Sequence, residues 1–451
     1  MGKKTELDVW ALQPVLRQFT LHSYLNLPKG PCPMVGSWKR VFKGCFCIPL
    51  FFCPTGASLA QNSPADSLLH LVGIAQEDTH KVSLLLSLSR AYTPTDRPKA
   101  TVIAREAQTL AQRLNDTGGL AKVYHRLGTI CRIDKQYDSA IVYLKRAEQL
   151  FAATNNTLLQ AEMWLDIGIC YSFLGKTNDA IAAMDTSRFL CLRLIPHDNP
   201  IVDSLAKGGV LGTYHFSWYA YYLIQDYTKG LDVLKEVGPL HIKYRGRVPP
   251  NHYNNLGVTY RMLGEYDRAV ESYFKGLELA IQQGSLEDQH RFHGNIASVY
   301  SLRGEYVKAR EHLVHALDVL NEEQNTPAIA WHVVTRGLAH TRANLGEIDT
   351  KLGRYADALD HYLAALKLFE MASTPLELAD FLVEFTEHHL HQSDYTNAAS
   401  LLERALGLYR RINNDRGISN VLYQLGKIAV AEQNLDKALE YHAQSLDVRK
   451  R

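Results

Sequence analysis

The sequence holds few of the patterns that identify catalytic or nucleic-acid-binding proteins. Its 451 residues contain no GxxxxGK[ST] phosphate-binding loop, no GxSxG nucleophile motif and no HExxH metal motif. The formal net charge is only +2, because 49 Lys and Arg are nearly balanced by 47 Asp and Glu. We therefore expect no catalysis, no cofactor and no nucleic-acid partner.

Cysteines and long apolar runs are also scarce. Seven cysteines are present, but the three that follow residue 60 are scattered, so they predict no disulfide framework. These three are Cys131, Cys170 and Cys191. The apolar run at residues 45–53 is far shorter than the roughly 20 residues that a membrane-spanning helix needs. We expect no transmembrane helix in the mature chain.

The first 60 residues differ in charge from the rest, with seven Lys or Arg against two acidic residues. From Met34 onward a basic start precedes the apolar run, and small residues stand one and three positions before Gln61. This is the order of a secretory signal peptide. We interpret residues 34–60 as a signal peptide and residues 1–33 as a non-native or disordered extension. The mature protein would then lie in the periplasm or cell envelope; if residues 34–60 are not a signal peptide, it is cytoplasmic.

The clearest pattern downstream is a helical hairpin at residues 251–280. Leu256, Gly257 and Tyr260 recur at the spacing of one helix face, and a second such cluster follows Gly264. A glycine at that point suits the residue just beyond a helix end. The stretch therefore predicts two antiparallel helices joined by a tight turn. Neither helix can bury its apolar face alone, so the hairpin needs neighbours.

The hairpin recurs along the chain. One position of the second helix is small in nine copies, mostly 40 residues apart. The nine residues are Ala100, Ala140, Ala180, Gly230, Ala269, Ala309, Ala358, Ala398 and Ala438. A Leu-Gly pair or a close variant lies twelve to thirteen residues upstream of most of them, with its glycine at Gly128, Gly168, Gly257, Gly346 and Gly426. We expect the two helices of each hairpin to approach closely at these positions.

These residues resemble the tetratricopeptide repeat family, whose units carry Leu-Gly, Tyr, Ala and Phe or Tyr at matching offsets. The resemblance covers residues 81–451 and implies an all-α, right-handed superhelical solenoid of about nine repeats. A helical bundle without repeats is the alternative. Homo-oligomers are possible.

The period of about 40 residues exceeds the family's usual 34. The additional residues amount to more than one helical turn, so we expect longer helices rather than longer loops. The capping box Thr374–Glu377 supports this expectation, and Ser285 and Thr157 are interpreted as the same kind of helix start.

The expected organisation is a lead-in at residues 61–80 followed by nine repeats. The repeats lie near residues 81–114, 121–154, 161–194, 211–238, 250–283, 290–323, 339–370, 379–412 and 419–451. An insertion at residues 195–209 separates two of them, with Pro200, Gly208 and Gly209 among its predicted helix breakers.

The resemblance implies that the first helices of the pairs line a concave groove that binds a protein or peptide. The groove residues predicted from the family's offsets are His125, Arg132, His215, Tyr219, Tyr222, Asn254, Arg261 and Arg291. The arginines would bind carboxylates and the tyrosines apolar side chains. The alternatives are a solvated surface charge for each arginine and packing between helices for the tyrosines.

We therefore expect a scaffold or adaptor with no catalysis of its own. The signal peptide and the repeat spacing also resemble the periplasmic repeat modules of sensor histidine kinases in Bacteroidota-type bacteria. One alternative is thus the sensory half of a truncated transmembrane signalling protein. A second is a metal protein or enzyme that uses the His388 region, where His388 and His391 could share a helix face, as could Glu387 and His391. No second cluster completes a four-ligand site, and the same residues fit a solvated helix edge, so we predict no metal site.

Overall fold

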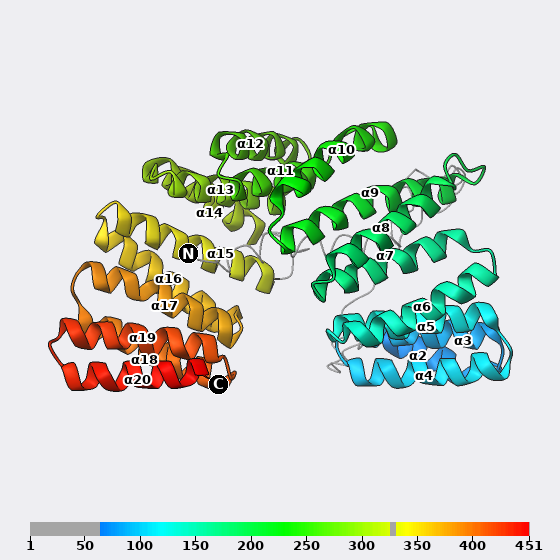
Figure 1. The fold of residues 1–451 in the computed structure, drawn as a ribbon, viewed down its shortest axis with the longest axis horizontal. Helices are drawn as coiled ribbons and strands as arrows, with labels where there is room; N and C mark the ends of the chain where they lie inside the picture. The colour runs from blue at the N-terminus through cyan, green and yellow to red at the C-terminus, as the bar shows by residue number, and fades with distance from the viewer. Residues whose placement is uncertain (1–63, 325–330, 451) are drawn as a thin grey trace, which may run out of the picture. The chain divides into compact units, whose positions relative to one another are not determined.

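The computed structural model describes residues 64–324 and 331–450. The predicted signal peptide and the extension before it lie outside the described residues. Within those two ranges every regular element is a helix, labelled α2 to α20 in Figure 1. None of these helices is long and apolar enough to cross a membrane. The prediction of an all-α solenoid of helix pairs is confirmed.

The chain divides into two compact units, Met1–Tyr244 and Arg245–Arg451. In the described part of unit 1, from residue 64 onward, a single helix precedes four helix pairs. Its helices are α2 (Pro64–Ile74), α3 (Thr79–Tyr92), α4 (Arg97–Arg113), α5 (Thr117–Ile133), α6 (Tyr137–Ala153), α7 (Thr157–Phe173), α8 (Thr177–Leu192), α9 (Pro200–Leu223) and α10 (Tyr227–Arg245).

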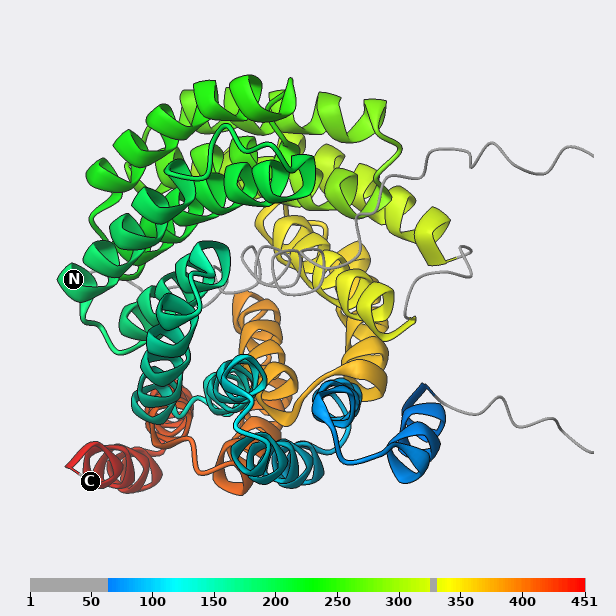
Figure 2. The ribbon, with the colours of Figure 1, turned by 90° about the vertical axis from the view of Figure 1, so that its right-hand side faces the viewer.

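Unit 2 consists of five helix pairs in the part of it that the structure describes. They are α11 (Pro250–Met262), α12 (Tyr266–Gln282), α13 (Leu286–Leu302), α14 (Tyr306–Gln324), α15 (Trp331–Lys351), α16 (Tyr355–Ala372), α17 (Pro375–His391), α18 (Tyr395–Arg411), α19 (Asp415–Ala431) and α20 (Leu435–Lys450). Within each unit the helices stack in chain order, as the continuous run of colours shows (Figures 1 and 2).

The 40-residue period arises from helix length. The helices α5, α6 and α7 each contain 17 residues, and the turns between them contain three. Two such helices with their two turns make one period. The expectation of longer helices rather than longer loops is confirmed.

The three-residue turns share one backbone conformation. Their middle residue has a positive φ, for example +61° at Lys135 and +77° at Gly264. After α5, the backbone N–H of Gln136 donates to the carbonyl oxygen of Cys131 at 2.8 Å, which satisfies a carbonyl that the helix end would leave unpaired. Glycine adopts this conformation without strain, which explains the pattern at Gly264 in the sequence.

Two of the three predicted helix starts are confirmed. The capping box Thr374–Glu377 forms as predicted, and the Ser285 side chain accepts the backbone N–H of Asp288 at 3.3 Å. The prediction at Thr157 is wrong by one residue, because Asn156 is the N-cap and its side chain accepts the N–H of Leu159. Asparagine is at least as good an N-cap as threonine, so the neighbouring residue takes the position.

The prediction that Gly208 and Gly209 break the chain's helical structure is also wrong. Both lie inside α9, which begins at Pro200 with Asn199 as its N-cap and runs for 24 residues. Proline at the first helical turn is favourable, because the N–H that it lacks has no intrahelical partner there. Residues 200–209 of the insertion therefore lengthen a helix, whereas residues 195–199 form the connection before it.

The core lies where the two helices of a pair approach each other. Gly128 faces Leu144 and the backbone of Ala140, and a Cβ added to this glycine would lie 2.9 Å from the Leu144 side chain. Gly168 meets Ala180 and Met184 in the same way. The small residues of the second helices are buried, with Ala140 and Ala180 fully inaccessible. The predicted close approach is confirmed, and it fixes which faces of the helices meet.

Unit 2 uses the same contact with an aromatic partner. A Cβ on Gly257 would lie 2.4 Å from the ring of Tyr273, which is fully buried.

We predict that Gly257→Ala destabilises unit 2 by about 1–3 kcal/mol, because the rigid ring cannot move aside. Urea unfolding followed by circular dichroism measures this. The control is Gly294→Ala on α13, where the added methyl group has open space and helix propensity favours alanine by about 1 kcal/mol. Equal effects of the two substitutions would contradict the close contact.

Candidate functional site

The predicted groove residues lie on the first helices of the pairs. We call these helices the first-helix layer of each unit: α3, α5, α7 and α9 in unit 1, and α11, α13, α15, α17 and α19 in unit 2. Neighbouring members contact each other directly, as α3 with α5 and α7 with α9 show. Polar side chains link them at separations of 37 to 41 residues, which is one period. We call these contacts the first-helix ladder. They are Ser89–Arg126, His125–Asp166, Asn251–Arg291, Asn254–Asn295, Arg336–Glu377 and Thr350–His388.

In unit 1 the ladder brings together two predicted groove residues. His125 Nε2 lies 3.5 Å from Asp166 Oδ2, and Arg132 Nε lies 3.9 Å from Asp166 Oδ1. Burial would raise the pKa of Asp166, but Arg132 and His125 hold it below its ordinary value. Burial, the largest single influence, would lower the pKa of His125, but the hydrogen bond to Asp166 and the charges of Glu162 and Asp166 together outweigh it, so the pKa is raised.

Nearby carboxyl and guanidinium groups respond to the same burial. Burial raises the pKa of Glu162, one helical turn before Asp166 on α7. Burial lowers the pKa of Arg126 to about 10, and the neighbouring charge of Arg90 acts in the same direction. The first-helix layer of unit 1 therefore holds several ionisable groups whose pKa values are shifted by burial and by neighbouring charges.

The remaining predicted residues of unit 1 lie on α9. His215 is buried and its Nε2 lies 3.1 Å from Nε2 of His241 on α10, so it packs between two helices. Tyr219 is half-buried, with its ring edge against Phe173 at a centroid distance of 6.0 Å. Tyr222 contacts the ring of Tyr227, with centroids 5.7 Å apart.

In unit 2 the predicted residues are mostly held by the ladder. Asn254 is fully buried and accepts a 2.8 Å hydrogen bond from Asn295. Arg291 donates to Asn251 at 2.6 Å and also pairs with Asp288. Arg261 is half-buried in the last turn of α11.

An acidic stripe runs along one face of α17, with Asp380 and Glu387 exposed and Glu384 half-buried between them. Burial raises the pKa of Glu384 to about 8, and the charges of Glu347 and Asp380 act in the same direction. Glu384 is therefore mostly protonated at neutral pH, and the stripe carries less negative charge than its composition suggests.

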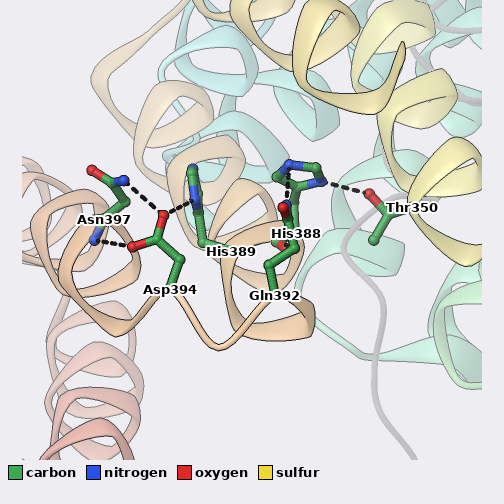
Figure 3. Close-up of polar contacts among 6 residues, drawn as sticks. All are labelled: Thr350, His388, His389, Gln392, Asp394 and Asn397. Carbon is green, nitrogen blue, oxygen red and sulfur yellow. Dashed lines mark hydrogen bonds and ion pairs between the residues drawn. The ribbon is translucent and has the colours of Figure 1, made fainter. Parts of the chain in front are cut away.

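The histidines near the end of α17 point to different partners, as Figure 3 shows. His388 is buried, with Nδ1 at 3.0 Å from the Thr350 hydroxyl of α15 and Nε2 at 2.8 Å from the Gln392 side chain. His388 belongs to the first-helix ladder, and its two ring nitrogens are occupied by Thr350 and Gln392.

His389 lies on the other side of the same turn (Figure 3). Its Nδ1 lies 3.0 Å from Asp394, the N-cap of α18, whose carboxylate also accepts the backbone and side-chain N–H groups of Asn397. In residues 64–324 and 331–450, no three His, Cys, Asp or Glu side chains converge at the positions of a metal's ligands.

The sequence prediction missed residues that the structure places beside the predicted ones. Tyr137 stacks on Phe173 with ring centroids 5.0 Å apart and an interplanar angle of 7°. Phe173 contacts Tyr219 in turn, so three rings from α6, α7 and α9 form an aromatic row. The sequence did contain a signal for this row. Phe173 is the last residue of α7 and stands next to a turn, so its ring could contact the start of another helix. Asp166 lies just before the Ile167-Gly168 pair of its repeat. The sequence analysis missed it because it predicted no groove residue in that repeat.

The chain matches three family models, each described as tetratricopeptide repeat. One matches residues 103–188 and 381–451, a second residues 250–280 and a third residues 344–412. The matches fall in both units and overlap most of the helix pairs described above.

Two curated relatives are each 24% identical to the chain. The 43 kDa receptor-associated protein of the synapse from Tetronarce californica aligns over 205 residues, 45% of this chain and 47% of that protein. The RNA polymerase-associated protein CTR9 from Caenorhabditis elegans aligns over 283 residues, 61% of this chain and 22% of that protein. The chain therefore spans about half of the first relative and about a fifth of the second.

Among solved structures, BtubC (BKLC) from P. vanneervenii superposes with a TM-score of 0.45 and 18% identity, covering 53% of this chain and 92% of that one. The apo form of RapI superposes with a TM-score of 0.42 and 16% identity, covering 73% of this chain and 97% of that one.

The ladder contact in unit 1 gives a measurable titration. We predict that Asp166→Asn lowers the pKa of His125, because the neutral amide no longer stabilises the imidazolium. The raised pKa of His125 means that its contribution to stability is present below pH about 6.5 and is lost as pH rises through the folded value. NMR of the histidine ring protons measures the shift. Asp185→Asn, which removes an exposed carboxylate on α8, is the control. An unchanged His125 titration in Asp166→Asn would refute the contact.

Proposed function

Because the chain belongs to the tetratricopeptide repeat family, we propose that it is a scaffold or adaptor that binds a protein or peptide segment on its first-helix layer. It catalyses no reaction of its own under this proposal. Repeat arrays of this kind offer an extended surface on which a partner segment can lie. The chemical character of the partner can be inferred from the side chains on this surface.

The observation that supports the proposal best is the aromatic row of Tyr137, Phe173 and Tyr219. Its members are half-buried, so each ring is held by packing and still presents an edge to solvent. The helices α5 and α9 end in apolar residues that are 41% exposed at Ile133 and 40% exposed at Leu223. Aromatic rings held by packing are typical of binding hot spots.

Arg132 adds a charged group next to this row. Its positive charge acts to lower the pKa of Tyr137, although burial, the largest influence, leaves that pKa raised. Its Nε is buried without a hydrogen-bond partner, and the ion pair with Asp166 is long at 3.9 Å. A guanidinium can donate to a carboxylate or carbonyl oxygen of a ligand that reaches its terminal nitrogens. The partner we propose therefore combines an apolar or aromatic side chain with an acceptor oxygen.

The test is quantitative recovery of partners from a cell extract on the immobilised protein, read by mass spectrometry. We predict that Tyr137→Ala/Tyr219→Ala lowers recovery of the specific partner at least tenfold, about 1.4 kcal/mol of binding free energy. The loss follows from removing two of the three rings. Circular dichroism must show that the variant remains helical.

The matched control is Tyr423→Ala, which removes a tyrosine that is 47% exposed on α19 of unit 2. This variant should recover the partner as the unmodified chain does. If both variants recover it equally, the aromatic row is not the binding surface.

We also propose that the protein is exported, with residues 34–60 acting as a signal peptide. The support is the sequence order of basic start, apolar run and small residues before Gln61. We predict that the mature protein isolated from its native cells begins at Gln61, because signal peptidase cleaves after the small residue. Mass spectrometry of the N-terminal peptide decides this, and a chain that still begins at Met1 would refute export.

A further inference from the structure

Three histidines gather on the α13–α14 pair of unit 2, apart from the first-helix ladder. His293 of α13 and His312 of α14 place their Nδ1 atoms 3.0 Å apart. His315, one turn beyond His312 on α14, has its ring centroid 5.3 Å from that of His293 and 6.4 Å from that of His312. Histidines three positions apart on a helix share a face, so all three rings lie on one side of the pair.

The short separation of the two Nδ1 atoms is informative. Two neutral imidazole nitrogens at this distance must share a proton, since their lone pairs otherwise face each other. A metal ion satisfies both lone pairs at once. For a tetrahedral zinc ion with bonds of about 2.0–2.1 Å, two ligand nitrogens lie about 3.3 Å apart, close to the observed distance.

The surroundings of the two rings suit a metal ligand. Tyr300 stacks on His312 with ring centroids 5.7 Å apart, and Phe274 of α12 meets the same ring edge-on at 5.6 Å. These contacts hold His312 in place. Burial keeps the pKa of His293 near 4, and the neighbouring His312 and His315 add to this shift, so its ring is neutral at physiological pH.

His315 gives the cluster access to solvent and offers a third ring nitrogen as a possible metal ligand. It is exposed, whereas His293 and His312 are half-buried. The three nitrogens do not converge on one point as the described side chains stand. An exposed histidine can change its rotamer at small cost, and turning His315 toward the other two rings would complete three ligands.

We propose that His293, His312 and His315 bind one divalent transition-metal ion of the kind that prefers imidazole, such as Zn²⁺, Ni²⁺ or Cu²⁺. Water fills the remaining position, since the site opens to solvent on the His315 side. The site links α13 to α14, so metal binding stabilises this helix pair. This inference does not depend on the proposed binding of a protein or peptide partner.

The test is titration of the full chain with Zn²⁺ against a chromophoric chelator, with Co²⁺ absorption as a second readout of ligand geometry. We expect saturable binding with one ion per chain at this site. His293→Ala and His312→Ala should each weaken it by roughly 100-fold or more, and His315→Ala by roughly tenfold. Zinc should also raise the melting temperature of the unmodified chain but not that of His293→Ala.

The control is His332→Ala, which removes an exposed histidine of α15 outside the cluster. It should bind zinc as the unmodified chain does. His312→Gln keeps a polar side chain of similar size, so it separates loss of a ligand from loss of packing. No saturable binding, or equal weakening by His293→Ala and His332→Ala, would overturn the proposal.

Discussion

The close approach of the two helices of a pair at a small residue is the contact on which the described structure depends. Where Gly128 meets Ala140, or Gly257 meets Tyr273, the backbone of one helix rests directly on its partner. No larger residue can occupy the position without moving a buried group. This contact sets which face of each first helix turns inward and therefore which residues remain for the ladder and for the surface. Packing within each helix pair therefore determines which residues are available to bind a partner.

The first-helix ladder shows how polar residues in this layer serve two purposes. An arginine such as Arg291 or Arg336 is held by an acceptor on the neighbouring repeat, which positions it and uses part of its hydrogen-bonding capacity. Arg132, which pairs with Asp166 at 3.9 Å, acts on the pKa of Tyr137 in the aromatic row. Residues engaged in the ladder thus align successive repeats, and some of them also lie beside residues that we propose contact a partner.

Much of the fold could be predicted from the sequence, because local signals and the repeat pattern agree. The capping box at Thr374 and the small residue at Ala140 each depend on contacts within one hairpin. The candidate site was harder, because burial of His215 or Asn254 depends on the neighbouring helix and not on its own offset. Two details of the fold were also hard to predict. Asn156 and Thr157 are adjacent and both suit an N-cap, and the glycines inside α9 are compatible with a helix once it is packed. The pairing of His388 with Thr350, 38 residues away, left no local trace.

The regular 17-residue helix followed by a three-residue turn has a consequence for how such a chain can change in length. Helix and turn together form a twenty-residue module, and two modules restore the original alternation of inner and outer helices. Duplication or loss of forty residues would therefore leave the faces that meet unaltered. A change of twenty would exchange the layers, placing ladder residues where the small contact residues belong. Exchange of whole pairs is therefore the change in length that keeps the helix faces of this array matched.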